Sequence, residues 1–187
     1  MTLDQYVLWV VSKYRLPTGP FSAAYRAGQR LSGLIKEWGR DYVLKVSYSG
    51  SYAKGTAVSG STDLDLFISF HPQTHGTLKD IYESLYSYLA QKGYSPYRQN
   101  VSIRIEYSGL SVDLVPGRKQ PGPTNDHSLF LNRAQTWRQT NVDTHVWLVS
   151  NSRRLDEIRA LKIWRNLNQL TFPSFYLSGA VGPKCLA

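Results

Sequence analysis

Two aspartates and a Gly-Ser pair lie close together in one short segment of the 187-residue chain. Asp63 and Asp65 belong to the run Asp-Leu-Asp-Leu-Phe-Ile, and Gly50-Ser51 precedes them. The apolar residues in this run predict a largely buried strand, on which side chains two positions apart share a face. Two ionised carboxylates on one face repel each other unless a cation lies between them, and oxygen ligands select a hard ion such as Mg²⁺.

The Gly-Ser pair predicts a turn that binds phosphate. Gly50 and Gly55 let the backbone approach a ligand, and a short helical turn opening at Ser51 would direct N–H groups and a hydroxyl toward a triphosphate. A Gly-Ser pair or an Asp-x-Asp run alone is common in ordinary turns and on exposed strands. Their combination at this spacing favours nucleotidyl transfer.

The run Gly50-Ser-Tyr-Ala-Lys-Gly-Thr, followed by Ser61-Thr-Asp-Leu-Asp-Leu, resembles the core motif of the polymerase-β-like nucleotidyltransferase superfamily. The most similar branch holds 2′-5′ oligoadenylate synthases, class I CCA-adding enzymes and bacterial cyclic-oligonucleotide synthases of the cGAS/DncV-like group. The resemblance extends from about Gly50 to Leu177. Thr62 stands where the family usually has Ser, which keeps a hydroxyl. The resemblance implies an α+β fold with a mixed β-sheet flanked by helices.

The family has a third carboxylate on a neighbouring strand, for which the chain offers two candidates. Glu106 lies on an alternating strand, on the face opposite Ile103 and Ile105, and is most simply an exposed residue. Asp113 is embedded among apolar residues, where a carboxylate is costly unless a metal or a basic group compensates it. Val-Asp-Leu-Val-Pro around Asp113 also resembles the family's third-carboxylate strand. We therefore favour Asp113 over Glu106.

A basic helix and a Pro-Ser segment follow. Apolar residues recur on one face of a helix predicted over 153–168, with Ser152 as a plausible N-cap. Arg159 and Lys162 lie three positions apart, and the simplest interpretation of such a pair is a solvated basic surface. By resemblance to the family, Lys162 contacts the triphosphate and Ser174, in Pro-Ser-Phe-Tyr-Leu, assists it.

The resemblance implies a metal-dependent enzyme that transfers NMP from an NTP to a hydroxyl and releases pyrophosphate. Asp63, Asp65 and Asp113 would be both catalytic residues and ligands of two Mg²⁺ ions, with Mn²⁺ as an alternative. Gly50, Ser51, Lys162 and Ser174 would bind the nucleotide phosphates. The partners are an NTP and an RNA or nucleotide acceptor.

Three functions are open on these residues. The first choice is a bacterial cyclic-oligonucleotide second-messenger synthase in antiviral defence. The second is a CCA-adding or RNA-tailing nucleotidyltransferase. The third, from another class, is a catalytically impaired nucleotide-binding protein or an antitoxin-like regulator. The base, the acceptor and the linkage depend on pocket shape, which the motifs do not specify.

Two regions are predicted along the chain. Residues 1–150 would form the catalytic core, and residues 151–187 would begin a C-terminal helical region that looks truncated. Family members continue after the Ser-Phe-Tyr-Leu run with Glu and further helices, whereas 178–187 are rich in small residues. Helices are predicted over 3–14, 21–38, 77–93 and 153–168, strands over 43–48, 63–70, 101–107 and 110–115, and a basic loop over 118–124.

Composition agrees with this interpretation. Twenty-two Lys and Arg against thirteen Asp and Glu give a net charge of +9, which favours polyanionic partners such as nucleotides or RNA. The single cysteine, Cys185, excludes an internal disulfide and suggests a reducing compartment. No segment has the pattern of a signal peptide or a membrane span, so we expect a cytoplasmic protein with no membrane partner. The four histidines lack the ligand spacing of a zinc site.

Overall fold

The computed structural model describes residues 1–60, 63–174 and 177. Thr62, Cys185 and the tail 178–187 lie outside the described residues. The chain divides into two compact units, each considered by itself. The sheet unit comprises Thr18–Gly50 and Asp63–Asp143, and the helical unit comprises Met1–Pro17, Ser51–Thr62 and Thr144–Ala187. The predicted boundary at residue 150 stays a prediction.

A mixed sheet forms the centre of the sheet unit. Its strands follow the order β1-β2-β5-β4-β3, and β6 and β7 extend it from β5. The β2 and β5 strands run parallel, whereas β1 pairs antiparallel with β2, and β4 pairs antiparallel with β5. The bounds are β1 Val43–Tyr48, β2 Leu64–Phe70, β3 Tyr97–Arg98, β4 Ile103–Tyr107, β5 Leu110–Lys119, β6 His127–Leu131 and β7 Thr136–Thr140.

The two faces of the sheet differ in chemistry because β-strand side chains alternate. One face is apolar, and its members pair across β2, β5 and β4: Leu64 and Ile105 both pair with Val112, and Leu66 pairs with Leu114. These side chains are at most 3% exposed. The other face carries Asp65 and Asp113, which sets the carboxylates apart from the apolar core.

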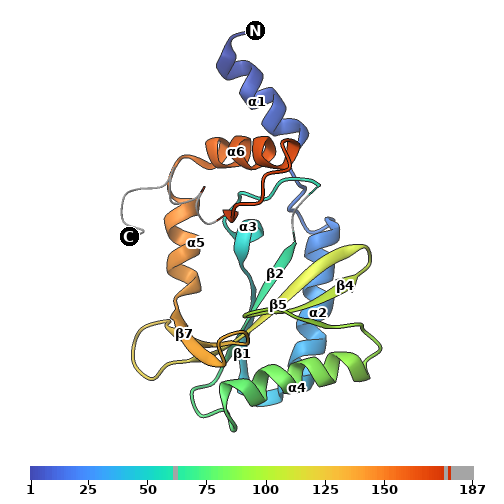
Figure 1. Ribbon diagram of the computed structural model, residues 1–187, viewed down its shortest axis with the longest axis vertical. Coiled ribbons are helices and arrows are strands. Elements are labelled where there is room, and N and C mark those ends of the chain that lie inside the picture. The colour runs from blue at the N-terminus through green and yellow to red at the C-terminus, as the bar shows by residue number, and fades with distance from the viewer. Residues whose placement is uncertain (61–62, 175–176, 178–187) are drawn as a thin grey trace. The chain divides into compact units, whose positions relative to one another are not determined.

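Two helices pack against the sheet and add to the core of the sheet unit (Figure 1). In α2 (Ala23–Gly39), Leu31 and Ile35 are buried, and α4 (Leu78–Gln91) buries Tyr82, Leu85 and Leu89. Burial of a leucine or isoleucine side chain contributes about 1.5–3 kcal/mol. A capping box, in which Thr77 and Asp80 exchange hydrogen bonds, fixes the first turn of α4. Arg40–Tyr42 forms a single 3₁₀ turn between α2 and β1.

The helical unit has a small apolar centre of its own. Val11 of α1 (Leu3–Lys13), Val58 and Ile163 of α6 (Leu155–Leu167) are buried together. Backbone contacts add to this packing, since the N–H of Ser59 donates to the carbonyl of Tyr14 at 2.8 Å. Two further helices, α3 (Gly50–Ala53) and α5 (Val142–Ser150), begin at the end of a sheet-unit segment and lie mostly in the helical unit. No helix within the described ranges is long and apolar enough to cross a membrane.

The predicted mixed sheet flanked by helices is confirmed, and every predicted helix and strand is present with ends shifted by a few residues. Among the described residues, the elements that were not predicted are β3, β6, β7, α5 and the 3₁₀ turn Arg40–Tyr42. The loop predicted over 118–124 begins too early, because β5 continues through Pro116 to Lys119. Pro116 lies between Leu114, the last residue paired with β4, and Gly117, the first paired with β6.

The N-cap predicted at Ser152 is wrong. Helix α6 begins at Leu155 after Arg154, whose side chain makes no capping hydrogen bond. The hydroxyl of Ser152 instead accepts a hydrogen bond from the N–H of Arg154 at 3.2 Å. Arg153 lies between Ser152 and Arg154 and has a φ of 58°, which is not helical, so Ser152 belongs to the turn before the helix.

Candidate active site

Three side chains form a row across the polar face of the sheet. Asp65 on β2 is the register partner of Asp113 on β5, and Asp113 is the register partner of Arg104 on β4. Register partners on adjacent strands point to the same face. The sheet therefore brings two of the three predicted carboxylates side by side and adds a guanidinium next to them.

Arg104 joins Asp113 to the third predicted carboxylate, Asp63. Its Nε donates to Oδ1 of Asp113, and its Nη2 donates to Oδ2 of Asp113, both at 2.9 Å. The same Nη2 also contacts Oδ2 of Asp63. Gln99 adds an amide hydrogen bond to Oδ1 of Asp113 at 2.9 Å. Asp113 is thus held on both oxygens, and Asp63 and Asp113 share one cationic partner.

Burial raises the free-energy cost of the charges on Asp63 and Asp113, and their ion pairs with Arg104 offset part of this cost. Asp113 is 8% exposed, and a buried carboxylate requires charged or hydrogen-bonding partners. Burial raises the pKa of Asp63, and the positive charge of Arg104 opposes this effect. The hydrogen bond to Asp113 raises the pKa of Arg104 above its usual range, and the nearby negative charges of Asp113 and Asp63 act in the same direction. Arg104 therefore carries its charge at every physiological pH.

Gly50 makes room for the carboxylate of Asp65. A Cβ atom at position 50 would overlap Oδ2 of Asp65 and stand 2.5 Å from its Cγ. The φ of Gly50 is +55°, a region that disfavours other residues. The N–H of Ser49 donates to the carbonyl of Asp65 at 2.9 Å and fixes the backbone just before. The predicted helical turn is present as α3, and it begins at Gly50.

Within the helical unit, the segment after Ser51 is tied to α6. The carbonyl of Ser51 accepts the N–H of Thr56 at 2.9 Å, which closes the turn. Lys162 donates from Nζ to the carbonyl and to the hydroxyl of Thr56 at 3.1 and 3.2 Å. Thr56 is fully buried, so Lys162 fixes the turn that carries Ser51.

The basic pair on α6 is not a solvated surface. Arg159 is 7% exposed and Lys162 is 4% exposed. Arg159 contacts the carbonyl of Gly55 and the carboxylate of Asp156. The hydroxyl of Ser174 accepts a hydrogen bond from Nη1 of Arg165, another residue of α6, at 2.9 Å. The predicted contacts of Lys162 and Ser174 with phosphate remain proposals.

Sequence reasoning missed Arg104 and Gln99. The alternation over 101–107 predicts Arg104 on the same face as Glu106, away from the apolar side chains. If the strand predicted over 101–107 had been paired with the strand that holds Asp113, the guanidinium of Arg104 would have been placed beside the carboxylate of Asp113. Glu106 remains exposed and accepts a hydrogen bond from the hydroxyl of Ser111 at 2.6 Å. Gln99 follows β3 with no pattern that marks it.

The aspartates have the donor chemistry of a magnesium site. Asp63, Asp65 and Asp113 offer only oxygen ligands and three negative charges, which suits a hard divalent ion. As the side chains lie, no three His, Cys, Asp or Glu residues within the described part of the chain are grouped to hold a metal. Because Arg104 bridges Asp63 and Asp113, a metal and the guanidinium would compete for the same oxygens.

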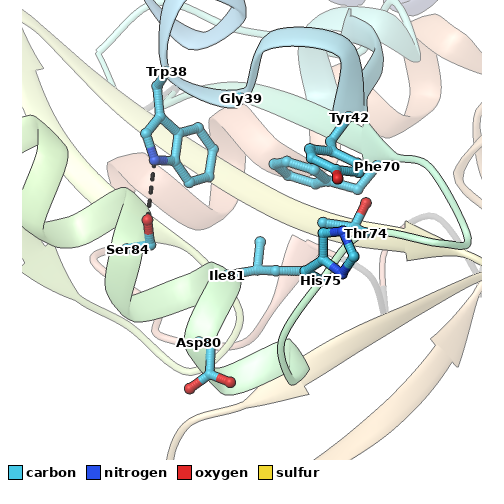
Figure 2. Close-up of a pocket in the computed structure, with 9 residues that line it drawn as sticks. All are labelled: Trp38, Gly39, Tyr42, Phe70, Thr74, His75, Asp80, Ile81 and Ser84. Atoms are coloured by element: carbon cyan, nitrogen blue, oxygen red, sulfur yellow. Dashed lines mark hydrogen bonds between the residues drawn. The ribbon is translucent and has the colours of Figure 1, made fainter.

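The sheet unit also contains a pocket of about 240 Å³ far from these residues (Figure 2). It is lined by aromatic side chains, among them Trp38, Tyr42 and Phe70. Nε1 of Trp38 donates to the hydroxyl of Ser84 at 3.1 Å. Phe70 is the last residue of β2, and Asp65 is the second. A separation of five positions corresponds to about 16 Å along an extended strand. The pocket is therefore separate from the carboxylate row.

Comparison with known proteins identifies the class. The family model described as "Nucleotidyltransferase domain" matches residues 31–118, which include Gly50 and all three aspartates. Residues 31–118 thus match a nucleotidyltransferase domain, and the chain has the polymerase-β-like nucleotidyltransferase fold. The resemblance stated from the motifs is confirmed. No curated protein matches the sequence.

Several solved structures share the fold. CdnC of Escherichia coli MS115-1, solved with ATP, is 22% identical with a TM-score of 0.71 over 93% of this chain and 62% of that one. The Elizabethkingia meningoseptica CdnE cyclic dinucleotide synthase, solved with GTP and Apcpp, is 14% identical with a TM-score of 0.71 over 97% and 75%. The RNA terminal uridylyl transferase Cid1 is 15% identical with a TM-score of 0.61 over 93% and 50%. The chain thus spans about three fifths of the CdnC chain.

Proposed function

We propose that this protein is a metal-dependent nucleotidyltransferase that joins NMP from an NTP to a hydroxyl and releases pyrophosphate. The observation that carries the proposal is the register pairing of Asp65 with Asp113, with Asp63 held beside them through Arg104. Such a carboxylate group on one sheet face has a high electrostatic cost. A divalent cation bound between these carboxylates would offset that cost, which supports a cation-dependent reaction at this position.

The reaction forms a bond between the acceptor oxygen and the α-phosphorus and breaks the bond from the α-phosphorus to the bridging oxygen of the β-phosphate. The proton of the acceptor hydroxyl passes to solvent water, and the β- and γ-phosphates leave together as pyrophosphate. Mg²⁺ held by Asp63, Asp65 and Asp113 would neutralise phosphate charge and lower the pKa of the hydroxyl. Gln99 orients Asp113 through its amide. Gly50 permits the position of Asp65, and Lys162 fixes the turn of Ser51, for which we propose a contact with the departing phosphates.

As the particular activity, we propose a bacterial cyclic-oligonucleotide synthase that makes a second messenger in antiviral defence. The support is the similarity to CdnC and CdnE, which exceeds the similarity to Cid1 in TM-score. The substrate would be ATP or GTP, since CdnC was solved with ATP and CdnE with GTP and Apcpp. The proposed compartment is the cytoplasm, where NTPs and Mg²⁺ are abundant.

RNA tailing is the second candidate. The likeness to the terminal uridylyl transferase Cid1 and the net charge of +9 favour it, because a basic protein attracts the RNA backbone. The two candidates share the chemistry at the α-phosphorus and differ in the acceptor. A nucleotide acceptor leads to a short product, and an RNA end leads to a lengthened strand.

The test uses purified protein with each NTP labelled at the α-phosphate, Mg²⁺ or Mn²⁺, and either no RNA or an RNA oligomer. A short product that resists phosphatase indicates a cyclic oligonucleotide, and a lengthened oligomer indicates tailing. Asp65→Asn should lower the rate roughly a thousandfold or more, because a metal ligand is lost. Asp41→Asn is the matched control, since Asp41 is an exposed carboxylate of the same unit. Equal activity of Asp65→Asn and the unaltered protein would overturn the proposal, and nucleotide binding without turnover would favour an impaired or regulatory protein.

A further inference from the structure

Arg104 already supplies a positive charge where the proposed reaction needs a metal. Its guanidinium contacts Asp63 and Asp113, two of the three proposed ligands. These carboxylates come from different segments, Asp63 from the residue before β2 and Asp113 from the middle of β5. One guanidinium thus connects two parts of the chain that would otherwise repel each other.

A neighbouring ion pair shows what an ordinary surface contact of this type looks like. Arg98 on β3 donates from Nε and Nη2 to Glu83, with the shortest distance 2.6 Å, and its guanidinium lies 3.4 Å from the ring centroid of Tyr86. Both charged side chains are more than a third exposed. Arg104 differs because its partner Asp113 has a side chain only 11% exposed. Removing one member of a buried pair leaves an uncompensated charge.

We propose that Arg104 is a resident counter-ion, which neutralises Asp63 and Asp113 while no metal is bound and which must leave Asp63 before a divalent cation can bind there. The inference rests on the proposed role of the aspartates as metal ligands. In this arrangement Arg104 sets the cation affinity of the site. It is a positioning residue that acts through the aspartates.

The exchange requires movement of the side chain. An arginine does not lose its proton at physiological pH, so it cannot give up the carboxylate by deprotonation. The contact with Asp63 must break, while Gln99 can keep its hydrogen bond to Asp113. The planar guanidinium binds both oxygens of Asp113, and a lysine ammonium would not reproduce that geometry. Lysine at this position should therefore compete less well with the metal.

The experiment measures Mn²⁺ binding by calorimetry without nucleotide, so the result does not depend on turnover. Arg104→Gln should bind Mn²⁺ about tenfold or more tightly than the unaltered protein, because both the competing group and its positive charge are gone. Arg104→Lys should fall between them. Arg98→Gln is the matched control: it removes the same charge from the adjacent strand and should leave Mn²⁺ affinity unchanged.

Thermal unfolding provides a second measurement. Without Mn²⁺, Arg104→Gln should unfold at a lower temperature than the unaltered protein, and added Mn²⁺ should raise its unfolding temperature by a larger amount. If Arg104→Gln does not fold, the Mn²⁺ affinity of Arg104→Lys is compared with that of the unaltered protein, and tighter binding by Arg104→Lys is expected. Equal or weaker Mn²⁺ binding by the Arg104 variants would overturn the inference.

Asp65→Asn distinguishes a failure of the proposed metal site from a failure of the role proposed for Arg104. Loss of Mn²⁺ binding in Asp65→Asn, with unchanged binding in Arg104→Gln, would retain the proposed metal site and overturn the role of Arg104. If neither the unaltered protein nor Arg104→Gln binds Mn²⁺, the metal site itself is wrong, and the role of Arg104 fails with it.

Discussion

The carboxylate of Asp65 lies directly against the Cα atom of Gly50, in space that any side chain at position 50 would occupy. Gly50 ends the connection from β1, and Asp65 is the second residue of β2. The antiparallel pairing of these strands brings the two residues together, since Tyr48 is the register partner of Leu66. The absence of a side chain at Gly50 is therefore a condition for the position of a proposed catalytic group.

Gly50→Ala should reduce turnover at least a hundredfold, because the new Cβ would displace the carboxylate of Asp65. It should also lower the free energy of unfolding by about 1–2 kcal/mol, since φ at this position is positive. Turnover of labelled NTP and thermal unfolding measure the two effects. Gly93→Ala is the control: its φ is +86° but nothing lies within 4 Å of an added Cβ, so it should lose stability and keep activity. Full activity of Gly50→Ala would contradict the proposed role of Asp65.

The choice between Asp113 and Glu106 can be tested directly. Asp113→Ala should abolish detectable turnover, because it removes a proposed metal ligand and leaves Arg104 with Asp63 alone. It should retain part of its NTP binding through Asp63 and Asp65. Glu106→Ala should change the rate by less than about threefold, since Glu106 is exposed and its carboxylate accepts a hydrogen bond from the hydroxyl of Ser111. Rates and calorimetric NTP affinities of both variants provide the check; an essential Glu106 would reverse the assignment.

The strands that hold the aspartates could be predicted because their patterns are local. Apolar residues around Asp63 and Asp65 define β2, and Asp113 within an apolar run defines β5. The register that makes Asp65 and Asp113 neighbours is a long-range property, because it depends on the parallel pairing of two strands separated by α4 and β4. The residue types and the two strands could therefore be predicted from the sequence. The closeness of Asp65 to Asp113 could not, because it depends on how the strands pair.

The missed contacts have the same physical cause. Arg104 faces Asp113 only once β4 pairs with β5, and the pattern of β4 alone makes it one polar residue of several. The spacing of Arg159 and Lys162 on one flank of α6 favours a solvated surface, and only the resemblance to the family gave Lys162 a contact with phosphate. Both are buried because the turn 51–56 packs on that flank, and this turn lies far from α6 in the sequence. Basic residues that bind backbone carbonyls give no signal in hydrophobic periodicity.

His127 gives the sheet unit a dependence of stability on pH. Burial lowers the pKa of His127, although its hydrogen bond to the carbonyl of Asn125 opposes the effect. The other ring nitrogen, Nε2, lies 2.7 Å from the hydroxyl of Ser69. With Nδ1 donating to the Asn125 carbonyl, Nε2 is left to accept from Ser69, which requires the neutral ring.

The sign follows from proton binding. The unfolded chain, in which histidine has its ordinary pKa of about 6.5, binds more protons than the folded protein just below that pH. The free energy of unfolding should thus be largest above about pH 6.5 and fall as the pH drops through and below that value. His127→Gln should weaken this dependence, and it should cost about 1–3 kcal/mol at pH 7.5 through lost buried hydrogen bonds.

Denaturant titrations at pH 7.5 and pH 5.5 measure the effect. His75→Gln is the control, because His75 is exposed and packs edge-on against Tyr42. It should follow the unaltered protein at both pH values. An unaltered slope in His127→Gln would mean that His127 is not the titrating group responsible.

Lys162 distinguishes a residue that fixes the turn from one that binds phosphate. Its Nζ donates to both oxygens of Thr56, so Lys162→Met, which keeps most of the apolar stem, should lower the free energy of unfolding by about 1–3 kcal/mol. If Lys162 also contacts the triphosphate, the variant should weaken NTP affinity by roughly tenfold to a hundredfold, the value of a charge-assisted contact of about 1.5–3 kcal/mol.

The matched variant is Thr56→Val, which removes only the hydroxyl contact to Lys162. It should lose about 1 kcal/mol of stability and retain NTP affinity within a few-fold, because the ammonium group remains. Calorimetric titration with a non-hydrolysable NTP and Mg²⁺, together with thermal unfolding, separates the two effects. Weak NTP binding in Lys162→Met alone would support the phosphate contact. Unchanged NTP binding with lowered stability would show that Lys162 acts only by holding the turn after Ser51, and the phosphate role proposed for it would then be withdrawn.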